Sequence, residues 1–189
     1  TPRHTMLVTT SRLVHKNALD IVIRALPLLP ESVHFFMLGD GTDKRALARL
    51  AEEIDVSKRV HFHSYVSLTA IPLYLKACTI FIRPSRSEGM GNSFIEAMAA
   101  GLPVIATQEG GISDFLFDAK RNPDKPTTGW AVDTDSPEQI AKAVTEILKD
   151  PERVTQVQTT AKRLVFAKYN WDLIASDMKA TFDRLLGNG

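Results

Sequence analysis

The chain has 189 residues, 23 Lys and Arg against 22 Asp and Glu, and a formal net charge of +1 at pH 7. This length can bury a substantial core, and the near-neutral charge provides no general attraction for nucleic acid or acidic membranes. No apolar run approaches the ~20 residues that a membrane-spanning helix needs. The single Cys78 excludes an internal disulfide and suits a reducing compartment, so we expect a cytoplasmic location.

Short apolar runs alternate with segments of helical periodicity through the first two thirds of the chain. The runs predict strands at 5–10, 33–38, 59–63, 79–83, 103–107 and 129–132. The periodic segments predict helices at 18–29, 43–53, 68–77 and 91–100. Strands separated by single helices imply βαβ units, and therefore an α/β protein with a parallel sheet sandwiched by helices.

The last third of the chain is expected to be helical. Ser136-Pro137-Glu138-Gln139 is typical of a capping box, and Asp150-Pro151 is typical of a second helix start. Asn170-Trp171-Asp172 opens a last helix with one apolar face, which carries Trp171, Ile174, Met178, Phe182 and Leu185. The polar loop 119–128 is expected to be the most mobile segment.

A glycine-containing loop joins the strand at 79–83 to the helix at 91–100. In open parallel sheets, ligands bind beyond the carboxyl ends of the strands. Free N–H groups at a helix start bind anions, and Gly89 and Gly91 would let a phosphate approach the backbone closely. Arg83 and Arg86 would add positive charge. The alternative is a tight turn that needs glycine for its backbone conformation alone.

Glu96 is the only charged side chain between residues 93 and 107, so we expect it to be buried in an apolar helix. A buried carboxylate without a partner is costly. Two ribose hydroxyls could donate to it. The alternative is an internal ion pair with Arg83, Arg86 or Arg12.

Glu88 precedes Glu96 by eight residues, in the loop before the helix. On one continuous helix the two carboxylates would lie ~12 Å apart along the axis, beyond the ~5–9.5 Å of a glycosidase pair. The spacing therefore favours two contacts along one extended ligand over a hydrolase.

Two further loops follow expected strands. Arg12 and Lys16 come after the first strand and could both face a diphosphate, although two solvated surface cations are the alternative. Gly39-Asp40-Gly41 follows the second strand and is either a turn or a close backbone approach to a ligand.

Several other site classes have no support in the sequence. The five histidines show no metal-ligand spacing with Cys or carboxylates, so we predict no metal site. The G-x-S-x-G and P-loop motifs are absent. The absence of G-x-G-x-x-G after the first strand argues against a dinucleotide oxidoreductase.

The order of these motifs resembles a known family. Arg83-Pro84-Ser85, the E-x7-E pair of Glu88 and Glu96, and the run from Glu96 to Thr107 are similar to the C-terminal nucleotide-sugar-binding domain of retaining GT-B glycosyltransferases of family 4, the group 1 family. Ser11-Arg12-Leu13, Gly39-Asp40-Gly41, Gly110-Gly111 and the Asn170-Trp171-Asp172 tail fit the same pattern.

The resemblance implies a single Rossmann-like donor-binding domain over residues 1–189. The start at Thr1, without an initiator Met, is expected to be that of a piece excised from a longer protein, whose N-terminal half binds the acceptor. The segment 171–189 would pack toward that missing half, which is also where a peripheral association with the inner face of the membrane would arise. The whole protein would transfer a hexosyl group, with retention and without an obligatory metal, from a nucleotide diphosphate sugar to a glycan, lipid or small molecule. The isolated domain would be inactive.

The resemblance also implies roles for individual residues. Glu88 would contact hydroxyls of the donor sugar, and Glu96 would bind the ribose. Arg12 and Lys16 would stabilise the leaving diphosphate. Backbone groups elsewhere would hold the rest of the donor: those of Gly89, Met90, Gly91, Asn92 and Ser93 at the diphosphate or sugar, and those of Gly39, Tyr65 and Val66 nearer the nucleoside.

Two departures from the family pattern leave alternatives open. The usual R-L-x-x-x-K-G would place Asn17 and Ala18 where Lys and Gly are common, which puts Lys16 one position early. The paired glycines are usually followed by a Glu, whereas Asp114 is the nearest acid here. The altered lysine region leaves a noncatalytic interaction module of this fold as an alternative function, and a nucleotide-sugar epimerase of the same architecture is kept as another.

Overall fold

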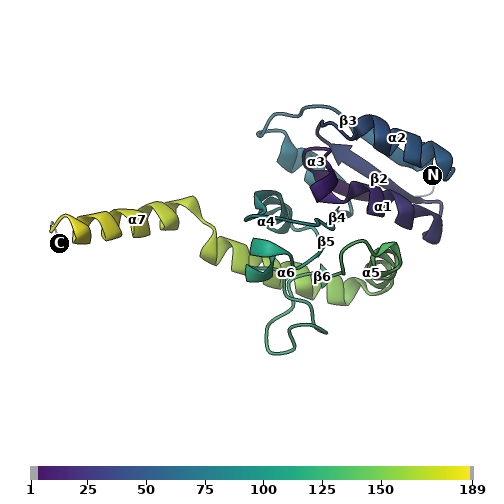
Figure 1. The fold of residues 1–189 in the computed structure, drawn as a ribbon. Coiled ribbons are helices and arrows are strands. Elements are labelled where there is room, and N and C mark those ends of the chain that lie inside the picture. The colour runs from purple at the N-terminus through teal and green to yellow at the C-terminus, as the bar shows by residue number, and fades with distance from the viewer. Residues whose placement is uncertain (1–3, 188–189) are drawn as a thin grey trace.

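The structure, a computed structural model, describes residues 4–187 (Figure 1). The expected domain bounds of 1–189, the chain start at Thr1 and the end of the 171–189 segment extend outside the described residues. Among the described helices, none combines the length and apolar character that crossing a bilayer requires.

A six-stranded sheet forms the centre of the fold, in the order β3-β2-β1-β4-β5-β6. All five strand pairings are parallel, which confirms the predicted α/β class. The strands are β1 Thr5–Thr10, β2 Val33–Leu38, β3 Val60–His63, β4 Ile80–Arg83, β5 Val104–Ala106 and β6 Trp130–Ala131.

The continuous apolar runs arise because helices cover both faces of the sheet. Ile80 and Ile82 face one core, with side chains of α1 Leu19–Ala25, α2 Lys44–Glu53 and α5 Pro137–Lys149. Phe81 faces the other core, with side chains of α3 Ile71–Ala77, α4 Asn92–Ala99 and α6 Pro151–Lys168. Adjacent residues of one strand are thus buried on opposite faces.

The first helix is shorter than its periodicity predicts. α1 ends at Ala25, and Leu26–Leu28 form a 3-10 turn instead of continuing to residue 29. Pro27 causes this end, because it has no N–H to continue the α-helical ladder. Pro72 is accommodated as expected, in the first turn of α3.

The closing helices begin at the predicted caps. Ser136 Oγ accepts from Gln139 N at 3.4 Å, and Asp150 Oδ1 accepts from Arg153 N at 3.0 Å. The capping box is only half formed, because the Gln139 side chain bonds Asp133 instead, with its Oε1 accepting from Asp133 N at 2.9 Å.

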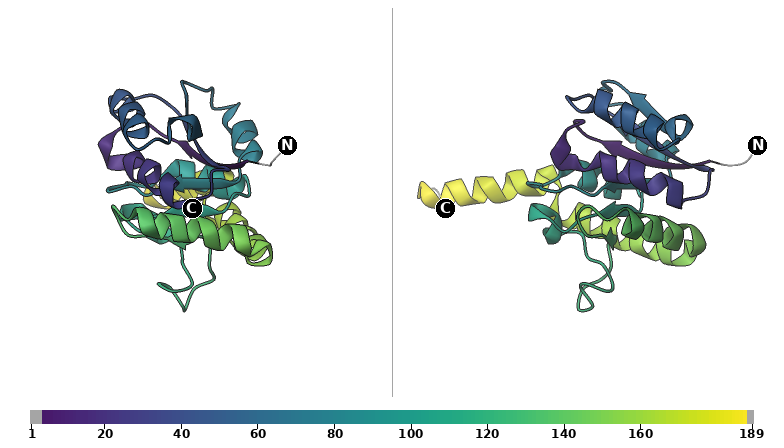
Figure 2. Two further views of the ribbon diagram at one scale, coloured as in Figure 1. Left: turned by 90° about the vertical axis from the view of Figure 1, so that its right-hand side faces the viewer. Right: turned by 45° about the vertical axis from the view of Figure 1, so that its right-hand side comes forward.

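The last helix, α7 Trp171–Leu185, projects away from the rest of the molecule (Figure 2). None of its residues is buried. Its apolar side chains are largely in solvent, with Trp171 77% and Leu185 74% exposed. This exposed apolar face is the one for which packing against another domain is expected, and that expectation remains a prediction.

Candidate functional site

The carboxyl ends of β1, β2 and β4 open onto two adjoining pockets. The Glu88 pocket, of about 370 Å³, is lined by Ser11, Arg12, Lys16, Asn17, Arg83, Glu88, Met90, Gly91, Asn92 and Ser93. The Glu96 pocket, of about 480 Å³, is lined by Thr10, Ser11, Arg12, Leu38, Gly39, Asp40, Tyr65, Val66, Leu68, Ile71, Asn92, Ser93 and Glu96. Since Ser11, Arg12, Asn92 and Ser93 line both, the pockets form one continuous groove. Every residue to which the family resemblance gives a role lines this groove, except Gly89.

Glu88 is held by a network of charged and polar contacts at one end of the groove. Its Oε2 accepts from Arg83 Nη2 at 2.6 Å, and its Oε1 accepts from Gly89 N at 3.0 Å. Lys16 Nζ lies 3.7 Å from Oε1. The Glu88 side chain is 11% exposed, whereas that of Lys16 is 46% exposed. One carboxylate is thus shared between a buried and an accessible cation.

The loop after β1 is folded so that Lys16 faces this pocket. Asn17 is buried, and its Nδ2 donates to the Arg12 carbonyl at 2.6 Å. Ala18 takes the left-handed conformation, with φ at 53°. Lys16 O accepts from Arg86 N at 2.8 Å, which joins this loop to the one that carries Glu88. Both residues line the Glu88 pocket, but Lys16 brings its charged end near Glu88, whereas the Asn17 amide is used to hold the loop.

Arg86 does not add free charge to the groove, contrary to the expectation. Its Nη2 lies 2.8 Å from an Asp20 oxygen and 2.7 Å from an Asp135 oxygen, and its Nη1 donates to the His15 carbonyl at 2.6 Å. The carboxylates of Asp20 and Asp135 neutralise the guanidinium charge. The contacts of Arg86 therefore hold the loop after β1 against the loop that carries Glu88.

The first turn of α4 presents unpaired donors to the groove. Gly91 precedes the helix at a φ of 76°, and no side chain caps it. A Cβ at Gly91 would lie 2.7 Å from a Phe94 ring carbon, so glycine is required on two grounds. Among the described residues, the amides of Met90, Gly91, Asn92 and Ser93 have no backbone or side-chain acceptor. These donors and the helix dipole favour an anion here.

Gly89 departs from the prediction, because its amide is not free. Its N–H donates to Glu88 Oε1, and its carbonyl accepts from Gly111 N at 2.8 Å. Gly110 and Gly111 pack directly against the backbone of this loop. A Cβ at Gly110 would collide with the Glu88 carbonyl, and a Cβ at Gly111 would collide with the Gly89 carbonyl. This packing explains both glycines without a following Glu, and Asp114 is exposed outside the groove.

Glu96 is exposed, which contradicts the expected burial. The helix buries Phe94, Ala97 and Met98, while Glu96 lies on the side that faces the groove. None of the ion pairs expected as alternatives forms within the described residues, since Arg83 pairs with Glu88 and Arg86 with Asp20 and Asp135. The pocket walls still remove enough hydration to raise the pKa of Glu96, an effect that the charge of Arg83 partly offsets.

Tyr65 and Val66 lie at the far end of the groove, in the loop between β3 and α3. Tyr65 is 83% exposed. Gly39 follows β2 at a φ of 146°, and a Cβ there would collide with the Ser11 carbonyl. The close approach that requires glycine is therefore to the protein backbone, although Gly39 also lines the Glu96 pocket.

Arg83 and the supporting glycines are the site features that the sequence did not resolve. Arg83 was expected to supply free charge, but it is buried and bound to Glu88.

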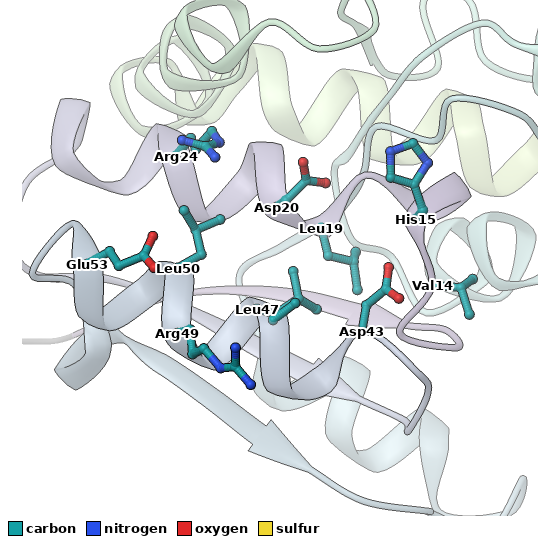
Figure 3. A pocket seen from close by; sticks show the side chains of 11 residues that line it. Val14, His15, Leu19, Asp20, Arg24, Asp43, Leu47, Arg49, Leu50 and Glu53 are labelled. Atoms are coloured by element: carbon teal, nitrogen blue, oxygen red, sulfur yellow. The ribbon is translucent and has the colours of Figure 1, made fainter.

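A separate pocket of about 410 Å³ lies between α1 and α2, with an apolar base of Leu19, Leu47 and Leu50 and a charged rim (Figure 3). None of the predicted site residues lines it.

Comparisons with known proteins give the chain its family. The family model described as "Glycosyl transferases group 1" matches residues 2–164. The chain is 31% identical over 182 residues to a GDP-mannose-dependent alpha-(1-6)-phosphatidylinositol monomannoside mannosyltransferase of Mycobacterium tuberculosis. This alignment covers 91% of this chain and 46% of that protein. It is 27% identical over 169 residues to a lipopolysaccharide core biosynthesis glycosyltransferase, LpsE, of Rhizobium meliloti, covering 89% and 47%. The chain thus spans about half the length of the curated relatives it matches.

Solved structures agree on the fold. The chain superposes on Anabaena HepE in complex with UDP and glucose with a TM-score of 0.87 at 20% identity, over 96% of this chain and 49% of that one. It also superposes on the C-terminal domain of a group 1 family glycosyl transferase, LpcC, of Francisella tularensis, with a TM-score of 0.75 at 22% identity, over 89% and 87%. These superpositions confirm the prediction that the chain has the Rossmann-like fold of one half of a GT-B protein. Because the family model matches most of the chain, the chain belongs to the glycosyl transferases group 1 family.

Proposed function

We propose that this chain binds the nucleotide-sugar donor of a glycosyltransferase that transfers a hexosyl group with retention. The observation that carries the proposal is the single groove formed by the two pockets, with Glu88 toward one end, cations and free amides between, and the unpaired carboxylate of Glu96 toward the other end. A nucleotide diphosphate sugar has the same order of chemistry along its length: sugar, diphosphate, ribose and base.

The diphosphate would lie at the middle of the groove, where Arg12 lines both pockets. The free amides of the first turn of α4 and the positive end of its dipole would hold the phosphate oxygens. Arg12 and Lys16 would stabilise the negative charge that develops when the glycosidic bond breaks. Lys16 has the exposure needed to move from Glu88 to an incoming phosphate.

The nucleoside would occupy the Glu96 pocket. Glu96 has no partner among the described residues, so both of its oxygens are open to ribose hydroxyls. The backbone at Tyr65 and Val66 would meet the base. The sugar would lie at the opposite end, against Glu88.

The relatives suggest which donor and acceptor to test first. GDP-mannose is the first donor probe because a 31% identical relative is named as GDP-mannose-dependent, and UDP-glucose is the second because HepE was solved with UDP and glucose. The half of the relatives that this chain does not span would bring the acceptor, a glycan, lipid or small molecule. Both named relatives favour a role in building cell-envelope glycans or glycolipids.

Titration calorimetry of the chain with GDP, UDP and ADP tests the proposal. We expect one of the three to bind, and Glu96→Ala to weaken it roughly tenfold through loss of charged hydrogen bonds. Glu52→Ala, an exposed carboxylate of α2 outside the groove, is the matched control and should leave the affinity unchanged. Binding of none of the three would contradict the function, and unchanged affinity in Glu96→Ala would contradict its ribose role alone.

A further inference from the structure

Arg83 connects three parts of the site from a buried position at the end of β4. Its Nη2 donates to Glu88 Oε2 at 2.6 Å, and its Nη1 donates to Ser93 Oγ at 2.8 Å and to the Thr10 carbonyl at 3.4 Å. Its side chain is only 7% exposed. The guanidinium therefore joins the end of β1, the Glu88 loop and the first turn of α4.

An aromatic ring fixes the guanidinium from one side. The Arg83 guanidinium carbon lies 4.3 Å from the centroid of the Phe94 ring, which favours a cation. Phe94 is fully buried and packs edge-on against Phe81, with ring centroids 5.4 Å apart. Hydrogen bonds hold the planar guanidinium at its edges, and the Phe94 ring packs against its face. Arg83 therefore has a single well-defined orientation.

This orientation determines that of Glu88. Arg83 takes Oε2, while Oε1 accepts from Gly89 N and faces Lys16 at the open side of the pocket. Burial lowers the pKa of Arg83 and the Glu88 charge opposes that shift, so the guanidinium stays protonated at neutral pH. Without Arg83, the carboxylate would keep only the contacts of Oε1 with Gly89 N and Lys16, and Oε2 would be unrestrained.

We infer that Arg83 is a positioning residue for donor-sugar recognition, which acts by holding the Glu88 carboxylate at a fixed orientation relative to the first turn of α4. The inference rests on the proposed function, since it takes Glu88 as the group that meets the sugar. It differs from a purely structural role in one respect. A structural ion pair would affect every part of the donor alike, whereas a positioning residue affects the sugar and spares the nucleotide.

A double-mutant cycle in the full-length protein that carries this chain separates the two roles. The variants are Arg83→Met, Glu88→Gln and the double variant, assayed with whichever of GDP-mannose and UDP-glucose the wild type turns over. We expect Arg83→Met to lower kcat roughly 10- to 100-fold, with a change in KM and in the Kd of the matching nucleoside diphosphate below about threefold. In the Glu88→Gln background Arg83→Met should cause no further loss. Arg83→Lys should recover part of kcat, because it keeps the charge but not the fork.

Two results would overturn the inference. One is independent losses that multiply in the double variant, and the other is weakening of the nucleoside diphosphate in parallel with kcat. If Arg83→Met does not fold, Arg83→Lys decides, since a wild-type kcat in that variant would also contradict the inference. A wild type that binds none of GDP, UDP and ADP overturns the proposed function, and this inference with it, before any variant is compared.

Discussion

At the scale of single residues, the site depends on cations that differ in exposure. Arg83 is buried and paired, Lys16 is half exposed beside the same carboxylate, and Arg12 is exposed on the wall shared by both pockets. A buried ion pair is costly to break, whereas an exposed one exchanges partners at little cost. Arg83 is thus suited to hold a group in place, and Lys16 and Arg12 are suited to meet an incoming phosphate.

The raised pKa of Glu96 leads to a prediction about pH. Only the ionised carboxylate accepts from two ribose hydroxyls, so the affinity for the donor should fall as pH drops from 7 toward the raised pKa, above the ordinary value of 4.5. GDP-mannose and UDP-glucose are suitable probes because their phosphates are diesters without a terminal group that titrates near pH 6. Calorimetry from pH 5 to 7 should show the fall in wild type and a flatter profile in Glu96→Gln. Equal pH profiles would exclude the carboxylate as the titrating group.

The ionisation of Glu96 should have opposite effects on binding and on folding: it favours donor binding and lowers the folding stability of the ligand-free chain. A carboxyl whose pKa is raised in the folded state favours that state when protonated, so its contribution is largest at low pH and is lost as pH rises past the raised pKa. Glu96→Gln should therefore raise the stability of the ligand-free chain slightly at neutral pH. A residue that weakens folding while it strengthens binding is typical of a functional site.

The residue scale is also where the sequence was least informative. It identified Arg83, Glu88 and Glu96 as site residues, but it predicted free charge at Arg83, which pairs with Glu88, and burial of Glu96, which is exposed. Which carboxylate pairs with Arg83 depends on how the loop folds back, and that depends on Gly110 and Gly111, more than twenty residues away. Glu96 lies in an apolar helix, but its side of the helix faces an open groove. Neither fact is present in local composition.

At the scale of elements, the apolar runs predicted all six strands to within a few residues, because strands covered on both faces are continuously apolar. Loop geometry was less predictable. Loops here are set by backbone approaches between segments distant in sequence, as at Gly39 against Ser11 and Gly110 against Glu88. Such glycines are indistinguishable in sequence from those that only permit a turn.

Gly110→Ala tests whether the paired glycines support the Glu88 loop. Gly110 has a φ of 56°, and a Cβ there would meet the Glu88 carbonyl. We expect a loss of about 2–4 kcal/mol in the free energy of unfolding, from the left-handed backbone and the steric conflict together. Gly101→Ala is the matched control, since its φ of 83° is also positive but nothing lies within 4 Å of the added Cβ. It should cost about 1 kcal/mol. Equal losses in urea unfolding would show that backbone strain alone accounts for Gly110.

At the scale of the whole molecule, α7 is the element that the described residues leave without a packing partner. Its apolar face carries Trp171, Met178, Phe182 and Leu185, each more than half exposed. A contiguous exposed apolar face of this kind marks an interaction site. Since the chain spans about half of its relatives, we propose that this face packs against the other half of the full-length protein.

Phe182→Glu tests this packing, and Ala180→Glu is its control on the opposite side of the same helix. Both residues are exposed here, so neither substitution should move the thermal unfolding midpoint of this chain by more than about 1–2 °C. In the full-length protein, Phe182→Glu would bury a charge at the interface between the halves. We expect it to lower the unfolding midpoint and the transferase activity, while Ala180→Glu leaves both unchanged. Equal behaviour of the two variants in the full-length protein would mean that the apolar face of α7 does not contact the other half.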